Sequence, residues 1–228
     1  FRSRDGQPMT ALSDKEKSDK PRRPGRPRGK KPDTASREQL MDIALALFAR
    51  EGIARVSLNA IAREAGVTPA MLHYYFSSRD ALVEQLLEER FMPLRERIGA
   101  IFLQHPDDPV NAFTQMVRVL AELAESNAWF APLWMQEMSG GVPVLRQKMA
   151  ERTGEESYRL MLARIADWQA AGRLNPDLTP ALLFPSLISL VLVPFARARN
   201  DERIRSISPE QIVSHALAMI GQGIRAGR

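Results

Sequence analysis

The sequence predicts an all-α fold. From about residue 36 onward, apolar residues recur at helical spacing, and stretches that alternate apolar and polar residues are almost absent. Helix start signals in which proline follows serine or threonine recur, as at Thr68-Pro69 and Ser208-Pro209. These observations favour an N-terminal three-helix unit of the helix-turn-helix kind, followed by a larger C-terminal helical domain.

The composition limits the possible classes of function. The 228 residues are 44% hydrophobic and 26% charged, which is ordinary for a folded protein. The absence of cysteine excludes disulfide scaffolds, thiolate metal sites and cysteine nucleophiles, and makes the cytoplasm the expected compartment. The histidines His73, His105 and His215 do not have metal-ligand spacing. We expect no metal site and no cofactor, although the sequence does not exclude magnesium held by carboxylates.

The net charge of +5 comes from the N-terminal end. Residues 1–36 contain eleven Lys and Arg against five Asp and Glu, whereas residues 37–82 contain five of each. Residues 20–31 combine seven cations with interleaved proline and glycine and no acid. Such a segment cannot bury a core, so residues 1–35 are predicted to form a disordered basic arm.

Two helices are predicted directly after the arm. Ser36 followed by Gln39 is typical of a capping box, and it begins a helix that ends before Gly52. Ser57 caps a second, shorter helix that stops at Gly66. Glycine suits this position because a sharp turn there requires a positive φ.

The third helix completes the helix-turn-helix arrangement. Thr68 caps it, Pro69 takes its first position, and it ends near residue 76. A fourth helix begins at Arg79, and Pro93 should bend or break it. Further helices are predicted over residues 109–126, 130–138, 143–171, 180–199 and 209–224.

One stretch of this region carries a family resemblance. Residues 44–82 read ALALFAREGIARVSLNAIAREAGVTPAMLHYYFSSRDAL, and the stretch resembles the DNA-binding domain of TetR-family transcriptional regulators. The resemblance implies a homodimer that places two third helices in successive major grooves of a roughly palindromic operator. It also implies release of DNA when a small molecule enters the C-terminal domain. The resulting division is a DNA-binding domain at 36–82 and a ligand-binding and dimerisation domain at 83–228.

The third helix contains no lysine or arginine, so the N–H groups at helix starts are expected to bind phosphate. By position in the family motif, base-edge contacts in the major groove fall to Pro69, Ala70 and His73, with Asn59 a further candidate. Phosphate contacts fall in the same way to Ser57, Thr68, Tyr74, Tyr75 and Arg79.

Three positions depart from the common pattern of the family. Pro69, His73 and Tyr75 stand where a lysine, a tyrosine and a histidine are common. The expected fold is unaffected, but the base preference should differ, because proline offers only apolar contact and histidine other hydrogen-bonding groups than tyrosine. Phe76 is expected to belong to the core.

The basic arm contains a Gly-Arg-Pro core and resembles an AT-hook at residues 22–31, although Pro24 replaces the arginine that usually precedes the glycine. Narrow A/T minor grooves attract arginine, and proline keeps the chain extended. Minor-groove insertion, general attraction to phosphate and an inert solvated tail are all open. The residues expected to act in the arm are Arg22, Arg23, Arg26, Arg28, Lys30 and Lys31.

The C-terminal domain is rich in aromatic residues and methionine, which suit an adaptable apolar pocket for an inducer that is not identified. Such residues at helical spacing are more often core than pocket. Possible polar anchors are Glu137, Arg118 and Arg164. The candidate pocket residues are Phe113, Met116, Trp129, Trp134, Met138 and Trp168.

The apolar run over residues 181–196 contains two prolines and is shorter than the roughly twenty residues of a spanning helix. We therefore expect no membrane association and assign the last two helices to a four-helix homodimer interface, as the resemblance implies. The candidate interface residues are Leu187, Leu190, Ile212, Ala216 and Met219.

Two other functions are alternatives to an operator-specific repressor. An enzyme is disfavoured because nucleophile-elbow, Walker and dinucleotide-binding motifs are missing from the sequence. The stronger alternative is an architectural A/T-rich DNA-binding protein that does not respond to a ligand.

Overall fold

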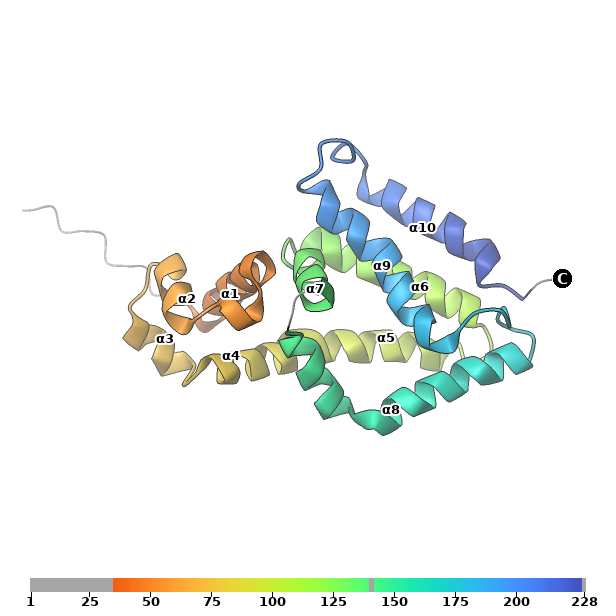
Figure 1. Ribbon diagram of the computed structural model, residues 1–228, viewed down its shortest axis with the longest axis horizontal. Coiled ribbons are helices and arrows are strands. Elements are labelled where there is room, and N and C mark those ends of the chain that lie inside the picture. Colours follow the sequence, from red (N-terminus) through yellow and green to blue (C-terminus); the bar gives the residue numbers. More distant parts are fainter. Residues whose placement is uncertain (1–34, 140–141, 227–228) are drawn as a thin grey trace, which may run out of the picture. The chain divides into compact units, whose positions relative to one another are not determined.

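The computed structural model describes residues 35–139 and 142–226, and it is helical throughout that range, with no strand (Figure 1). The all-α prediction is confirmed. The predicted arm, including Arg22 to Lys31, lies outside the described residues. The elements are α1 Arg37–Glu51, a 3₁₀ turn η1 Ile53–Arg55, α2 Leu58–Ala65, α3 Pro69–Tyr75, α4 Arg79–Leu86, a π-helical turn η2 Leu87–Phe91, α5 Met92–Gln104, α6 Pro109–Ser126, α7 Phe130–Ser139, α8 Val144–Ala170, α9 Pro180–Ala198 and α10 Pro209–Gly223.

The first three helices are fixed by caps and by one apolar interior. The capping box at Ser36 and Gln39 is formed in full. Gly66 has φ 66° and ψ 24°, the left-handed conformation that ends α2 and starts the turn into α3. Leu72, Phe76 and Phe48 are completely buried in one hydrophobic cluster, and α2 packs against both α1 and α3. Local cap chemistry and burial therefore agree on where each helix begins and ends.

The fourth helix passes through a π-helical turn instead of ending. In η2 the Met92 N–H bonds the Leu87 carbonyl five residues back, and Pro93 then stands in the first turn of α5. Proline lacks an N–H and its ring crowds the carbonyl four residues before it. The wider π-helical turn makes room for that ring, so the chain continues into α5.

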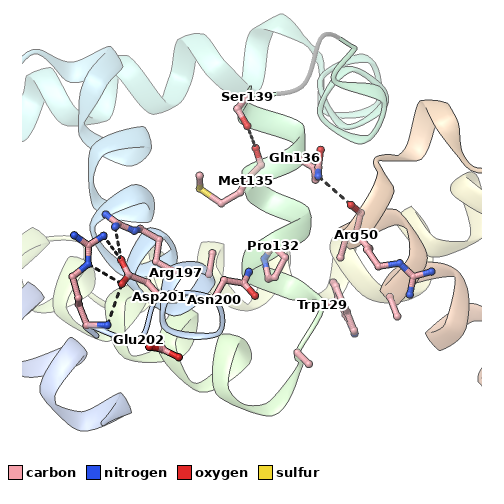
Figure 2. A pocket seen from close by; sticks show the side chains of 15 residues that line it. Arg50, Trp129, Pro132, Met135, Gln136, Ser139, Arg197, Asn200, Asp201 and Glu202 are labelled. Atoms are coloured by element: carbon pink, nitrogen blue, oxygen red, sulfur yellow. Dashed lines mark hydrogen bonds and ion pairs between the residues drawn. The ribbon is translucent and has the colours of Figure 1, made fainter. Parts of the chain in front are cut away.

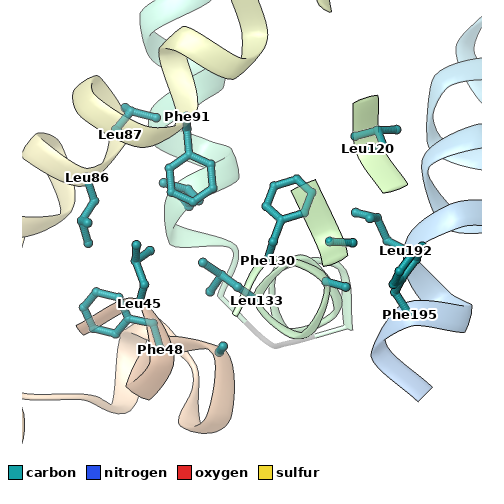
Figure 3. Packing of buried hydrophobic residues seen from close by; sticks show 14 of the residues in the cluster. Leu45, Phe48, Leu86, Leu87, Phe91, Leu120, Phe130, Leu133, Leu192 and Phe195 are labelled. Atoms are coloured by element: carbon teal, nitrogen blue, oxygen red, sulfur yellow. The ribbon is translucent and has the colours of Figure 1, made fainter. Parts of the chain in front are cut away.

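The C-terminal helices share a core with the first three. α7 packs against both α1 and α9, and α6 packs against α5, α9 and α10. Figure 3 shows Phe48, Phe130 and Leu133 pointing into this common interior. The predicted boundary at residue 82 is thus a division by role, because the hydrophobic core continues across it.

One interruption in the later helices was not apparent in the sequence. α8 bends at Gly154, which has φ 76° and ψ 159°, so the predicted helix 143–171 is two helical segments joined at a glycine. α9, by contrast, continues through Pro185 and Pro194 for 19 residues. Among the described residues it is the one helix with the length and hydropathy to cross a bilayer, a property that core helices of water-soluble folds share.

Candidate DNA-binding surface and ligand cavity

The outer face of α3 presents the residues predicted to meet DNA bases. Pro69, Ala70 and His73 are exposed, whereas Leu72 on the opposite side is completely buried. Of the helix's seven residues, only Leu72 is fully enclosed, so the helix is held by one side and open on the other. Asn59, the further candidate on α2, is exposed as well.

The helix starts around α3 are capped by side chains that leave backbone N–H groups free. Ser57 Oγ accepts the Ala60 N–H at 3.2 Å, and Thr68 Oγ1 accepts the Met71 N–H at 3.2 Å. The first N–H groups of a helix have no partner within the helix and can bind an anion. Ser57 and Thr68 are therefore placed to bring phosphate to two helix starts.

Sequence reasoning missed Ser78. Its Oγ accepts the Ala81 N–H at 3.1 Å and caps α4. The predicted start of this helix at Arg79 included no cap. Ser57, Ser78 and Arg79 line one shallow depression of about 390 Å³. The signal was present, because serine just before a helix is a preferred cap.

The remaining residues predicted to contact phosphate differ in their exposure and in the contacts that they already make. Tyr74 is 83% exposed, whereas Tyr75 is half-buried and packs edge-to-face on Tyr74 at 5.2 Å between ring centroids. The Arg79 guanidinium already donates to the Ala54 carbonyl at 2.9 Å. That bond ties the Arg79 side chain to η1. Phe76 is core, as expected.

An apolar cavity of about 350 Å³ lies among α5, α6, α7, α8 and α9, and we call it the inner chamber. Of the predicted pocket residues, Met116, Trp134 and Met138 line it. Phe113 is completely buried and lines none of the described cavities, because it packs on Phe102 and Trp168.

A second cavity of about 440 Å³, the outer chamber, borders the inner one and contains Trp168 in its wall. Arg164, one of the predicted polar anchors, also lines the outer chamber, with its guanidinium 5.6 Å from the Trp168 ring centre. Arg118 is exposed on α6 and lines neither chamber.

Glu137 is the buried charged group of the inner chamber, with 7% of its surface exposed. Its Oε2 accepts the backbone N–H of Arg146 at 3.0 Å, so it caps the start of α8 from the end of α7. Burial raises the pKa of this carboxyl, and the backbone hydrogen bonds oppose that rise. Glu137 thus joins two walls of the cavity.

A larger and more polar cleft of about 900 Å³ lies where α1, α7 and the segment after α9 meet (Figure 2). Trp129, predicted as a pocket residue, lines this cleft instead. Three of its charged groups pair with one another: Asp201 accepts hydrogen bonds from Arg203 and Arg197, which lower the pKa of its carboxyl. Across the cleft, Gln136 Nε2 lies 3.5 Å from the Arg50 carbonyl and links α7 to α1.

The predicted interface residues divide into two groups. Leu187, Ile212 and Ala216 are buried in the chain's own core, because α9 and α10 pack against each other and on α6. Leu190 is half-buried and Met219 is 58% exposed, so these two retain surface for a partner. Leu182, which sequence reasoning passed over, is 61% exposed on α9.

Residues 40–86 match the family described as "Bacterial regulatory proteins, tetR family". The match covers the capped three-helix unit and α4. RutR, an HTH-type transcriptional regulator of Escherichia coli strain K12, is 29% identical over 157 residues, which is 66% of this chain and 70% of RutR. Residues 40–86 are thus similar to the DNA-binding domain of TetR-family regulators.

Other relatives extend the similarity to the C-terminal helices. The HTH-type transcriptional repressor KstR2 of Mycolicibacterium smegmatis is 23% identical over 198 residues, covering 85% of this chain and 95% of KstR2. The solved structure of the ketosteroid transcriptional regulator KstR2 of Mycobacterium tuberculosis has a TM-score of 0.63 at 19% identity, over 83% of this chain and 95% of that one. The second similarity establishes a shared fold. The matched family and these relatives are all named as transcription regulators, and none of them is named as an enzyme.

Proposed function

We propose that this regulator is a repressor that binds a roughly palindromic operator as a homodimer and leaves it when a small apolar ligand binds. The observation that carries the DNA-binding part is the outer face of α3. Pro69, Ala70 and His73 are exposed there above the buried Leu72, and capped helix starts flank them. A helix held on one side and open on the other can enter a major groove.

The homodimer is supported by α9. This helix has a mean hydropathy of 1.9, yet only 28% of its apolar window is buried within the chain. Exposed apolar surface of this extent on a helix marks an interaction site. A second copy that pairs α9 and α10 with their counterparts would cover Leu182 and Met219 together.

The dimer is tested by one exposed residue and a control. Leu182→Glu should produce monomers by light scattering, because it places a charge in the proposed contact without disturbing the core. Leu103, 75% exposed at the end of α5, provides the control: Leu103→Glu should leave the dimer intact. A dimer that survives Leu182→Glu contradicts this interface.

The ligand response is supported by the inner chamber, whose volume of about 350 Å³ is in the range of small-molecule pockets. The relative KstR2 is named as a ketosteroid regulator, and ketosteroids are predominantly apolar molecules. An apolar inducer for this chain agrees with both points, and we propose that class.

Two contacts join the chamber walls to the DNA-binding helices. Lys148 Nζ and Arg152 Nη2 of α8 pair with Glu84 of α4 at 2.6 and 3.3 Å. Gln136 of α7 approaches the α1 carbonyl of Arg50. A ligand that displaces α7 or the first segment of α8 would therefore shift α1 and α4, and with them α3.

The basic arm is proposed to add affinity through A/T-rich minor grooves or phosphate. The described DNA-binding helices carry as many acids as bases, so the arm would supply most of the counterion release. Each phosphate contact contributes a slope of about −0.9 in a plot of log affinity against log salt. Deletion of residues 20–31 should weaken binding strongly at moderate salt and flatten that slope, and an unchanged slope would remove the arm from the proposal.

The decisive experiment is footprinting on DNA upstream of the protein's own gene, at two salt concentrations, with and without residues 1–31. A discrete and roughly palindromic footprint that keeps its position without the arm supports the operator-specific repressor. Diffuse protection of A/T-rich DNA that disappears with the arm favours the architectural alternative. The cytoplasm is the compartment in which we expect this function.

A further inference from the structure

The inner and outer chambers share part of their walls. Arg95, Ile98 and Phe184 line both cavities, so the two spaces meet along one face of α5 and at the first half of α9. The bend of α8 at Gly154 lies at the same junction. Met149, before the bend, lines the inner chamber, whereas Thr153 next to the bend and Met161 after it line the outer one.

The two chambers differ in chemistry. Arg95 aside, the wall of the inner chamber is apolar except at the α7–α8 junction. There Glu137 accepts the backbone N–H of Arg146, and the Arg146 guanidinium, 3.6 Å from Met138 Sδ, also lines the wall. The outer chamber adds hydroxyl groups from Thr153, Ser157 and Tyr158. The indole N–H of Trp168, in the wall of the outer chamber, already donates a hydrogen bond to the Pro106 carbonyl at 2.7 Å.

The outer chamber carries two guanidinium groups and no carboxylate. Arg95 and Arg164 line it, and in the described part of the chain neither forms an ion pair. Arg159, one turn from Arg164, shows the contrast: it is paired with Glu156 at 2.7 Å and lines neither chamber. Unpaired guanidinium groups beside hydroxyl donors bind anionic oxygen groups through charge-assisted hydrogen bonds.

We propose that the two chambers are one binding site for an amphipathic ligand, with an apolar body in the inner chamber and an anionic head at Arg95 and Arg164. The inference rests on the proposed ligand response and adds to it the chemical class of the inducer. The head is a carboxylate or a phosphate, which share anionic oxygens. A neutral or cationic ligand of the same length would leave the two guanidinium groups without a partner.

The test compares four ten-carbon probes by calorimetry below the concentration at which they form micelles: decanoate, decyl phosphate, 1-decanol and decylammonium. The wild-type protein should bind an anionic probe at least about tenfold more tightly than 1-decanol, with decylammonium weakest. The double variant Arg95→Gln/Arg164→Gln should lose this preference and keep its affinity for 1-decanol. Arg159→Gln, the matched control on α8, should behave as the wild type. Whichever anion binds more tightly identifies the head.

Equal affinities of the wild-type protein for decanoate, decyl phosphate and 1-decanol would overturn the anionic head while leaving the apolar ligand response in place. A preference for anions that persists in the double variant would overturn the role of Arg95 and Arg164. Failure of all four probes to bind the wild-type protein would overturn the joined site and the proposed ligand response together.

Discussion

The helix-turn-helix unit and the helices around the chambers are built differently. Ten of the twelve largest completely buried side chains lie between residues 40 and 87, and the other two are Phe113 and Met116. The helices around the chambers contain a π-helical turn, a glycine bend and internal prolines. Close packing makes the first unit rigid, whereas the second, with its irregular backbone, contains the two chambers.

The largest expected difference between the two regions is in the cost of removing an aromatic side chain. Phe48→Ala should lower the free energy of unfolding by about 3–5 kcal/mol, because it empties a closed interior. Trp134→Ala should cost only about 1–2 kcal/mol, because the half-buried indole already borders a cavity. Urea unfolding of both variants measures the contrast, and similar losses would mean that the two regions are packed alike.

The second-largest expected effect is a loss of operator affinity with no loss of stability. His73→Ala on the outer face of α3 should weaken operator binding by about 1–3 kcal/mol, the range of one base contact, with no change in the unfolding midpoint. The control Leu103→Ala alters an exposed residue of the other region and should change neither quantity. A stability loss in the His73 variant would show that the histidine is structural. Gel-shift titration and thermal melting provide both measurements.

The two regions also use glycine in different ways. Gly66 is in the left-handed helical conformation, which asparagine tolerates, so Gly66→Asn should cost only a few tenths of a kcal/mol. Gly154, at φ 76° and ψ 159°, is in a region that is essentially restricted to glycine, so Gly154→Asn should cost about 1–3 kcal/mol. Nothing lies within 4 Å of a Cβ at either position, so the difference is one of backbone alone. Equal costs in chemical denaturation would argue against the bend in α8.

The smallest expected effect is at the ion pairs between the two regions. Hydrogen bonding from Lys148 lowers the pKa of the Glu84 carboxyl below its ordinary 4.5. The contribution of this pair to stability is therefore fully present above pH 4.5 and is lost as pH falls through the lowered pKa. Because Glu84 is partly exposed, Glu84→Gln should cost only about 0.5 kcal/mol at neutral pH, and less in high salt.

The control for this pair is Glu156→Gln, which removes an ion pair within α8 and joins no other helix. It should leave operator affinity and ligand release unchanged, whereas Glu84→Gln should alter the coupling between them. A Glu84→Gln cost that does not change between pH 7 and pH 3 would contradict the assigned partner. Thermal melts across that range, with and without added salt, decide the point.

Most helix boundaries could be predicted because they depend on neighbouring residues. Ser36 with Gln39, Thr68 with Pro69, and Gly66 each act within one helical turn, so the sequence contains the information. Ser78 was missed although its signal was equally local. The bend at Gly154 could not be inferred in this way, because an isolated glycine within a helical pattern is also compatible with a straight helix.

The sequence by itself determined the all-α class and the helix-turn-helix unit, since both follow from spacing and caps, and the family resemblance indicated which residues of α3 would be exposed. Only the tertiary structure decided which aromatic residues border a cavity, and that Leu187 and Ala216 face the core while Leu182 faces outward. The physical reason is that burial on a helix apolar on all sides is set by the helices packed against it. The joined chambers depend in the same way on Arg95, Arg164 and Phe184, which are far apart in sequence and meet only in the fold.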